Sequence, residues 1–327
     1  MRVLTEPHHT ISMPDGILSY ELCGNEFAYN LLAVAMRDCL RLLLVGLPEE
    51  TVEFGYSHLL DLTLDKEDVE RIDERRVVSS IAFAPDTSLN CTPKNVTLCA
   101  ARWEIMDIFR TDLGQFNTVH KLRGHKDYIN DMAWVCEGNL LASVSDDFTC
   151  RFWNTSDQRT VLTFRLTSAG MSVKGHPDDP SKVLVAEKKG IIRLYNVNTK
   201  QAVISVQSPK FPLMSADWAL SNRYFITALA GGDVITWDLN RPVVPADVKQ
   251  VHEDGGRSVR FAPGSSEMVL ASIGRPDVTL KVFAAKSTMP LIEATLKTFG
   301  GMAWHQRLPY ISAVSDRDLH FWKVQMK

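Results

Sequence analysis

Four residues in one stretch of the chain have side chains that are able to form either a catalytic or a structural hydrogen-bonded chain: His125, Ser143, Asp147 and Trp153. Histidine, serine and aspartate make up the triad of many hydrolases, in which the serine sits on a strained turn. Ser143 instead lies within the apolar run 140–144, which predicts the middle of a strand. A buried aspartate needs hydrogen-bond donors, and a neutral histidine backed by a hydroxyl supplies them. We therefore predict a structural tetrad without a catalytic function.

The tetrad belongs to a pattern of three predicted strands, at 129–134, 140–144 and 149–153. A Gly-His pair at 124–125 precedes the first strand, an Asp-Asp turn precedes the third, and Trp153 ends the pattern. This order is typical of a WD repeat, which forms one four-stranded blade of a β-propeller. One blade cannot cover its own hydrophobic faces, so we expect several more blades along the chain.

The ends of the third strands recur at a regular spacing. They are marked by Phe109, Trp153, Tyr195, Trp237, Phe283 and Trp322. Their separations of 44, 42, 42, 46 and 39 residues bracket the period of about 40–45 residues that is expected for WD40 blades. The matching second strands are predicted at 140–144, 183–186, 225–228, 268–272 and 311–314. Apolar runs at 17–22, 31–35 and 40–45 predict one further blade, which brings the total to seven.

Only the pair at 124–125 keeps the Gly-His signature in its proper place, and His176 is predicted to be a turn histidine. Most blades are therefore expected to be held together by apolar packing. The sequence predicts an all-β fold, a seven-bladed WD40 propeller, with residues 1–327 as a single domain. The last blade ends at its third strand, and an unpaired sheet edge would be exposed. We expect an N-terminal strand, either 2–5 or 10–12, to complete that blade and close the ring.

Composition excludes several classes of function. The net charge is −3 and no basic stripe with interleaved aromatic residues occurs, which argues against direct nucleic-acid binding. The six cysteines show no C-x-x-C spacing and are expected to be reduced and buried in a cytosolic or nuclear protein. The N-terminus has no apolar core of signal-peptide length, and charged residues interrupt the most apolar stretch, 31–47. Membrane insertion is therefore not expected.

One segment of the chain is strongly acidic. Residues 49–76 hold ten Asp and Glu against four Lys and Arg, a local charge of −6. The same region lengthens the spacing between the first two blades by roughly twenty residues, which predicts an inter-blade insertion at about 47–76. Within it, 59–64 predicts a strand and 65–72 a short helix. The segment is either a solvated connector or a rim insertion that docks a partner.

No other pattern predicts a reaction or a cofactor. The Gly-Gly pairs at 231–232 and 300–301 are typical of turns and not of phosphate-binding loops, and the paired carboxylates at 146–147 and 178–179 also fall in turns. The two adjacent histidines at 8–9 supply too few ligands for a metal site. We expect no cofactor, no metal, no catalytic residue and no small-molecule substrate, which leaves a protein that presents surfaces to other proteins.

Several segments in register resemble the family of small WD-repeat nucleoporins, of about the mass of this chain (36.7 kDa), from the Y-shaped outer-ring complex of the nuclear pore. These segments are 124–130, 143–154, 170–173, 185–195 and 212–218. The resemblance is best over about 120–240 and weaker but collinear from 15 to 322.

This resemblance implies a non-catalytic scaffold in the nucleus, at the nuclear envelope and nuclear pore complex, with kinetochore association in mitosis. It also implies docking on other nucleoporins, chiefly the largest α-solenoid subunit of the Y complex. Support of pore assembly and of nucleocytoplasmic transport, both mRNA and protein transport, would follow from that position. No partner-binding residue is carried over, because the family contacts have no short motif that this chain matches.

Two other classes of function stay open. WD40 substrate receptors of cullin-type ubiquitin ligases often carry Trp-Asp-x-Arg after the third strand, whereas 153–156 and 237–240 both lack the arginine. A reader of peptides or histone tails would need an acidic, aromatic-lined central channel, and identifying the channel residues requires the positions of the innermost strands.

Overall fold

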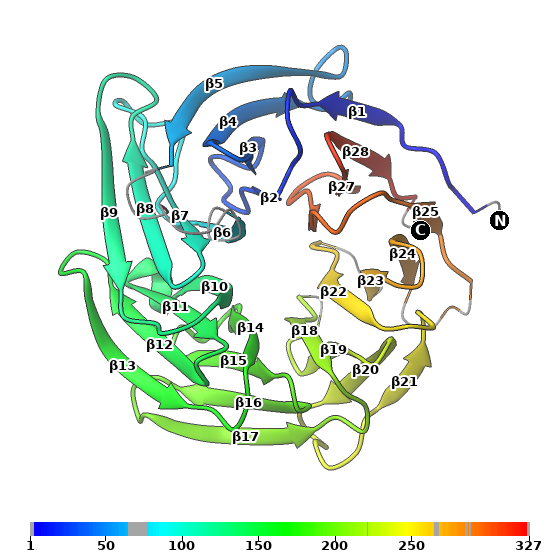
Figure 1. Cartoon of the computed structure of the whole chain (residues 1–327). Helices are drawn as coiled ribbons and strands as arrows, with labels where there is room; N and C mark the ends of the chain where they lie inside the picture. The colour runs from blue at the N-terminus through cyan, green and yellow to red at the C-terminus, as the bar shows by residue number, and fades with distance from the viewer. Residues whose placement is uncertain are drawn as a thin grey trace.

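Seven four-stranded antiparallel sheets form the blades of a propeller around a central axis in the computed structural model (Figure 1). The structure describes residues 3–64, 77–220, 222–264, 268–284, 287 and 289–325. Within these ranges the regular structure is β, apart from the short 3-10 segment η3 (Cys136–Gly138). The prediction of an all-β, seven-bladed WD40 propeller is therefore confirmed.

Every blade places one strand at the central axis and one at the rim. The innermost strands are β2 (Ser19–Leu22), β6 (Val78–Phe83), β10 (Ile129–Val135), β14 (Gly170–Gly175), β18 (Leu213–Trp218), β22 (Gly256–Phe261) and β26 (Met302–Trp304). The second strands are β3 (Leu31–Ala35), β7 (Val96–Arg102), β11 (Leu140–Ser145), β15 (Lys182–Glu187), β19 (Phe225–Ala230), β23 (Val269–Gly274) and β27 (Tyr310–Ser315).

The outer half of each blade follows in the same chain order. The third strands are β4 (Cys39–Gly46), β8 (Ile105–Thr111), β12 (Thr149–Asn154), β16 (Ile191–Asn196), β20 (Asp233–Asp238), β24 (Thr279–Ala284) and β28 (Asp318–Lys323). The outermost strands are β5 (Gly55–Thr63), β9 (Asn117–Arg123), β13 (Arg159–Arg165), β17 (Gln201–Gln207), β21 (Asp247–Gln250), β25 (Ile292–Thr295) and β1 (His9–Ser12).

Burial along the strands explains why the second strands were the clearest in the sequence. All residues of β3, β23 and β27 are buried, because neighbouring blades cover both faces of these strands. Strand β7 is buried in the same way but was not predicted from the sequence. A continuous short apolar run is the pattern expected for such a strand. The outermost strands β13 and β17 are mostly exposed, which leaves a much weaker apolar signal.

The acidic stretch was only partly understood from the sequence. Residues 55–63 are not an insertion between blades but the strand β5, the outermost strand of the first blade, which contains most of the predicted strand 59–64. Asp61 in β5 receives two hydrogen bonds of 2.8 Å from the guanidinium of Arg41 in β4. Because the carboxylate is paired with a cation of the neighbouring strand, an acidic residue is compatible with this strand. The predicted helix at 65–72 lies outside the described residues.

The ring closes by pairing the two ends of the chain, as predicted. Strand β1 runs antiparallel to β28, with Ile11 opposite Leu319, so 10–12 is the closing segment (Figure 1). The alternative segment contributes differently: Leu4 forms a parallel bridge to Ile292 in β25 of the neighbouring blade. Phe54 stacks on His9 at a ring distance of 4.4 Å and packs the first blade against the closing strand.

The pairing of β1 with β28, which we call the seam, can be tested directly for its contribution to stability. Ile11 is fully buried in the closing strand, so Ile11→Ala is expected to lower the free energy of unfolding by about 2–5 kcal/mol. The matched control is Thr10→Ala, because Thr10 is exposed in the same strand. Urea unfolding of both variants measures the difference, and an equal effect of the two substitutions would contradict a seam that is held by burial.

Candidate functional site

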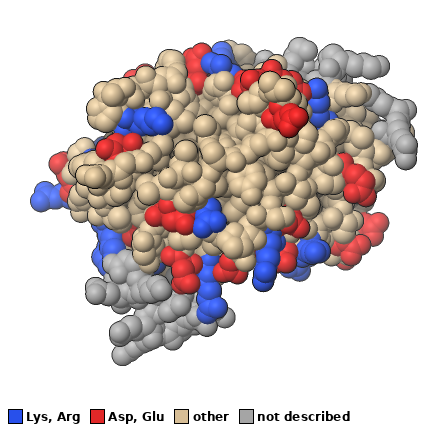
Figure 2. Space-filling view, turned by 90° about the horizontal axis from the view of Figure 1, so that it is seen from above, with Lys and Arg blue, Asp and Glu red and all other residues tan. Residues whose placement is uncertain are grey.

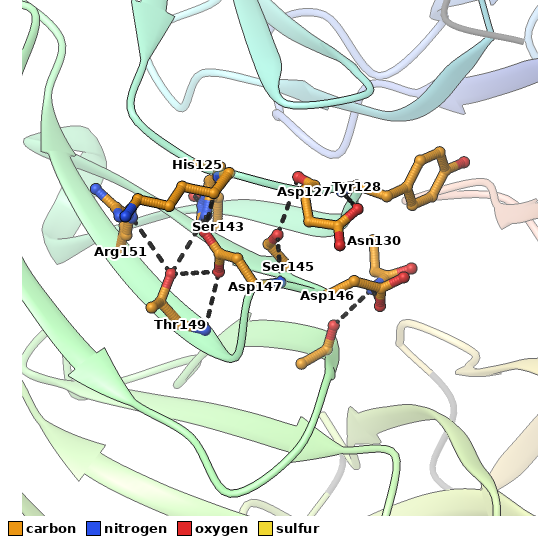
Figure 3. Close-up of polar contacts among 12 residues, drawn as sticks. His125, Asp127, Tyr128, Asn130, Ser143, Ser145, Asp146, Asp147, Thr149 and Arg151 are labelled. Carbon is orange, nitrogen blue, oxygen red and sulfur yellow. Dashed lines mark hydrogen bonds and ion pairs between the residues drawn. The ribbon is translucent and has the colours of Figure 1, made fainter.

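The four predicted tetrad residues converge in the third blade. Figure 3 shows three of them, His125, Ser143 and Asp147. The Nδ1 atom of His125 lies 2.8 Å from Oδ2 of Asp147, and its Nε2 atom lies 2.7 Å from Oγ of Ser143. The indole nitrogen of Trp153 donates to the same Ser143 oxygen at 2.8 Å. A neutral imidazole that donates from Nδ1 and accepts at Nε2 satisfies all of these contacts. The loop before β10 is thereby tied to β11 and β12.

The carboxylate of Asp147 is fully engaged by the surrounding turn. It also accepts hydrogen bonds from the backbone N–H of Lys126 at 3.0 Å and from the hydroxyl of Thr149 at 2.6 Å. Burial by itself raises the pKa of a carboxyl group, but the hydrogen bonds from His125 and Thr149 outweigh it and lower the pKa of Asp147. This carboxyl group is therefore ionised at neutral pH.

The serine, histidine and aspartate stand in the same hydrogen-bonded order as a hydrolase triad, so access decides between catalysis and structure. The side chain of Ser143 lies in β11 and its residue is 0% exposed. Its hydroxyl oxygen already accepts from Trp153. A nucleophile must reach a substrate carbon, and this arrangement offers no approach to one. The geometry favours a structural role for the tetrad.

A second histidine–serine pair escaped the sequence analysis. In the sixth blade, Nε2 of His252 lies 2.9 Å from Oγ of Ser272, and both residues are buried. Burial and the nearby Lys281 lower the pKa of His252 to about 4, so the ring is neutral. The WD signature has a glycine before the histidine, whereas Val251 precedes His252. The pair could have been found from its spacing. The distance along the chain from His252 to Ser272, and from Ser272 to the strand-end aromatic Phe283, is close to the corresponding distances in the third blade.

In the fourth blade, a glutamate and not a histidine binds the loop before the innermost strand. The carboxylate of Glu187, at the end of β15, accepts from the backbone N–H groups of Thr167 and Ser168 at 2.7 and 3.0 Å, and it pairs with Arg193. A buried charge is stable only when it is paired and hydrogen-bonded, and this glutamate is both. His176 forms the predicted turn, since its Nδ1 atom accepts from two backbone N–H groups that follow it.

The two histidine–serine pairs allow a matched comparison. Ser143→Ala leaves both an indole N–H and an imidazole nitrogen without a partner, and we expect a loss of about 1–3 kcal/mol in the free energy of unfolding. Ser272→Ala breaks only the contact to His252, because Phe283 has no donor, and should lower it by about 1 kcal/mol. Chemical denaturation compares the two, and an effect of Ser272→Ala equal to or larger than that of Ser143→Ala would be inconsistent with the tetrad.

The innermost strands enclose a central cavity of about 280 Å³. Charged side chains of five blades project from these strands: Glu21, Asp131, Lys174, Asp217 and Arg260. Two of the carboxylates accept hydrogen bonds from the innermost strand of the next blade. Asp131 accepts from the backbone N–H of Val173 at 3.1 Å and from the ammonium of Lys174 at 2.9 Å, and Asp217 accepts from the backbone N–H of Phe261 at 2.8 Å.

The charges of this channel are mixed in sign. Burial raises the pKa values of Glu21 and Asp217, and for Glu21 the value reaches about 7. Asp131 is also penalised by burial, but Lys174 and Arg260 lower its pKa. The charged residues that line the cavity are Glu21, Asp131, Arg257 and Arg260, so the lining is not the acidic aromatic cage that a histone-tail reader would need. The polar groups mainly connect one inner strand to the next.

The raised pKa of Glu21 leads to a pH-dependence with a defined sign. The folded value of about 7 lies above the ordinary value of 4.5, so the folded state keeps a proton that the unfolded chain releases, and stability falls as the pH rises between these values. Glu21→Gln is expected to remove this fall and to stabilise the protein at about pH 8 by on the order of 1–3 kcal/mol. The free energy of unfolding is measured as a function of pH. Glu253→Gln is the control, because Glu253 is exposed, and it should show no such gain.

Within the described ranges, no group of three or more histidine, cysteine or acidic side chains is placed to hold a metal ion, and no helix has the length and apolarity to span a membrane. The described cysteines are all free thiols, but the prediction that they are buried is wrong for Cys91, which is exposed in the loop after β6. Cys39 and Cys136 are half-buried.

The outer surface of the propeller carries both charged and exposed apolar side chains. Seen from the rim that carries β1 and β5, the middle of the surface is largely uncharged, and acidic and basic side chains of both signs stand around it (Figure 2). Large apolar side chains are exposed in several loops between strands: Phe27, Val52, Phe116, Phe148, Phe211, Tyr224, Val243 and Val244. Apolar side chains that are exposed singly are common on protein surfaces, whereas a large contiguous patch would mark a binding site.

Comparisons with known proteins agree with this architecture. A family model described as "WD domain, G-beta repeat" matches residues 116–154. Nucleoporin Nup37 of Drosophila melanogaster is 69% identical over 328 residues, which covers 100% of both chains. Nucleoporin Nup37 of Mus musculus is 37% identical and that of Homo sapiens 35% identical, each over 254 residues, 76% of this chain and 77% of the relative.

Proposed function

Because the chain belongs to the nucleoporin Nup37 family, we propose that it is a non-catalytic scaffold subunit of the outer ring of the nuclear pore complex. The observation that carries this proposal is the 69% identity to the Drosophila nucleoporin along the entire chain. The site of action is the nuclear pore complex in the nuclear envelope. An association with the kinetochore in mitosis is a further expectation of the same proposal.

The proposed mechanism is the rigid presentation of a surface. The propeller, with residues 1–327 as one domain, docks on other nucleoporins and chiefly on the largest α-solenoid subunit of the Y-shaped complex. A standard protein–protein interface buries about 1,600 Å² in total, which a few loops and one blade edge can supply. By holding the solenoid in a fixed geometry, the subunit supports pore assembly and the nucleocytoplasmic transport of mRNA and protein.

The acidic segment at about 47–76 is proposed to help in docking. Charged surfaces of opposite sign accelerate association and fix its orientation. Not all of the acidic side chains are available for this purpose. Glu49 lies 2.5 Å from Lys323 and receives a hydrogen bond from Tyr310, and Glu50 accepts from Asn30. Glu53 is exposed, so Glu53→Lys tests electrostatic steering without breaking these internal contacts.

Two other functions are less well supported. A substrate receptor of a cullin-type ubiquitin ligase would be expected to carry arginine three residues after the strand-end tryptophan, where Ser156 and Asn240 stand. A reader of histone tails or modified peptides would need an acidic channel, whereas Lys174 and Arg260 lie among the channel carboxylates. Each of these functions remains an outcome that the same experiment can reveal.

The proposal is tested by affinity purification of the tagged full chain from nuclear envelope extract, with mass spectrometry of the retained proteins. We expect subunits of the Y-shaped complex, with the largest solenoid subunit among them, because the propeller docks on it directly. Binding of the purified solenoid in size-exclusion chromatography then establishes that the contact is direct. Recovery of a cullin adaptor in the absence of Y-complex subunits would overturn the proposal.

A further inference from the structure

A groove of about 290 Å³ opens where the loops after the innermost strands of the second, third and fourth blades meet. It lies beyond the end of β10 that is opposite to the tetrad loop, because η3 follows β10 directly. Rings make up much of its lining: Pro85, Trp134, His176, Pro177 and Pro180. The groove belongs neither to the tetrad nor to the central channel.

The walls of this groove are held in place by neighbouring blades. The indole nitrogen of Trp134 donates to the backbone oxygen of Ala82 at 3.2 Å, which fixes the ring against the second blade. A Cβ atom at Gly138 would lie 3.1 Å from Cδ of Pro85, so these two loops are in close contact. Proline rings and a hydrogen-bonded indole lose little conformational freedom when a ligand binds. The groove is therefore preorganised.

The charge of the lining is acidic. Glu137 and Asp178 are its charged residues, and neither lysine nor arginine lines it. Asp178 is already engaged by Arg223 at 2.6 Å. Glu137 is exposed, and within the described ranges its carboxylate forms no ion pair or hydrogen bond. One carboxylate beside an indole and several proline rings is thus open to an incoming cation.

We propose that this groove binds an arginine side chain that projects from a helix of a partner protein. The aliphatic stem of arginine would pack on Trp134 and Pro177, and its planar guanidinium group would pair with Glu137. Arginine fits better than lysine, since a guanidinium group stacks on an aromatic ring and is less strongly hydrated than an ammonium group. The inference rests on the proposed function for the nature of the partner, a helical solenoid, but not for the chemistry of the groove.

The groove is tested directly with a blocked helical peptide of alanine and leucine that carries one central arginine. The full chain is labelled with ¹⁵N at its indole nitrogens, and the Trp134 signal is assigned through Trp134→Phe. We expect the arginine peptide to shift this signal and a citrulline peptide of the same sequence to leave it in place. Glu137→Gln should weaken the apparent affinity about tenfold, because a charge-assisted contact is lost.

Glu253→Gln is the matched control, since it removes an exposed carboxylate from the sixth blade, far from the groove in the ring. It should bind the arginine peptide like the unaltered protein. The proposal is overturned if the citrulline peptide binds as well as the arginine peptide, or if Glu137→Gln binds the arginine peptide unchanged. Both outcomes concern only the groove and leave the proposed function untouched.

A second experiment separates the two proposals. The largest solenoid subunit of the Y-shaped complex is titrated onto the unaltered chain, Glu137→Arg and Glu253→Arg. Loss of binding for Glu137→Arg alone, with recovery when one arginine of the solenoid is replaced by glutamate, supports the groove as a docking pocket. Equal binding of all three proteins overturns this inference and leaves the scaffold function standing. If the solenoid does not bind the unaltered chain while the arginine peptide does, the groove stands and the proposed partner is wrong.

Discussion

Closure of the ring is the physical constraint on which the rest of the structure depends. A blade buries its two faces only against the blades on either side, so the first and last blades must meet. The last sheet obtains its fourth strand from the start of the chain, and Ile11 in that strand is packed in one cluster with Tyr20 of the first blade and Phe321 of the last. Without this pairing two apolar faces and a sheet edge would be open to water and to other chains.

Once the ring is closed, polar contacts near the axis set the spacing between blades. The hydroxyl of Tyr20 donates to the backbone oxygen of Ser312 across the seam at 2.6 Å, and Trp304 donates to the backbone of Arg260 in the neighbouring blade. Asp131 and Asp217 do the same for other pairs of blades. These groups are buried or partly buried, and an unpaired polar group in such a place would be costly. They favour one register between neighbouring sheets.

This organisation explains why the WD signature can erode while the fold persists. The third blade keeps the full tetrad, the sixth keeps only His252 and Ser272, and the fourth replaces both by Glu187. Each device supplies a hydrogen-bond partner for the loop that leads into an inner strand. The apolar faces, which do not depend on any one of these devices, carry most of the burial, as the blade-to-blade clusters show.

The features that the sequence revealed are those that depend on local pattern. Six of the seven second strands were located to within one or two residues as short apolar runs, and the third strands were recognised by the aromatic residue near their end. The second strand of the second blade, β7, was not predicted. The tetrad followed from fixed offsets. Strand β5 was mistaken for part of an insertion, because its partner Arg41 is distant in the sequence and its acidic residues mask the strand pattern. The choice between two closing segments needed the register of β28, which no short motif encodes.

The residues of the channel and the groove could not be assembled from the sequence for a similar reason. Glu21 and Arg260 belong to the first and sixth blades, and they share one cavity only because the ring is closed. Pro85, Trp134 and Pro177 come from three successive blades, and their loops meet at a radius that only the packing of inner strands defines. A rigid ring therefore creates composite surfaces from residues that are ordinary in isolation. For a protein that works as a scaffold, such surfaces carry the function, because their geometry is set before a partner arrives and little order has to be gained on binding.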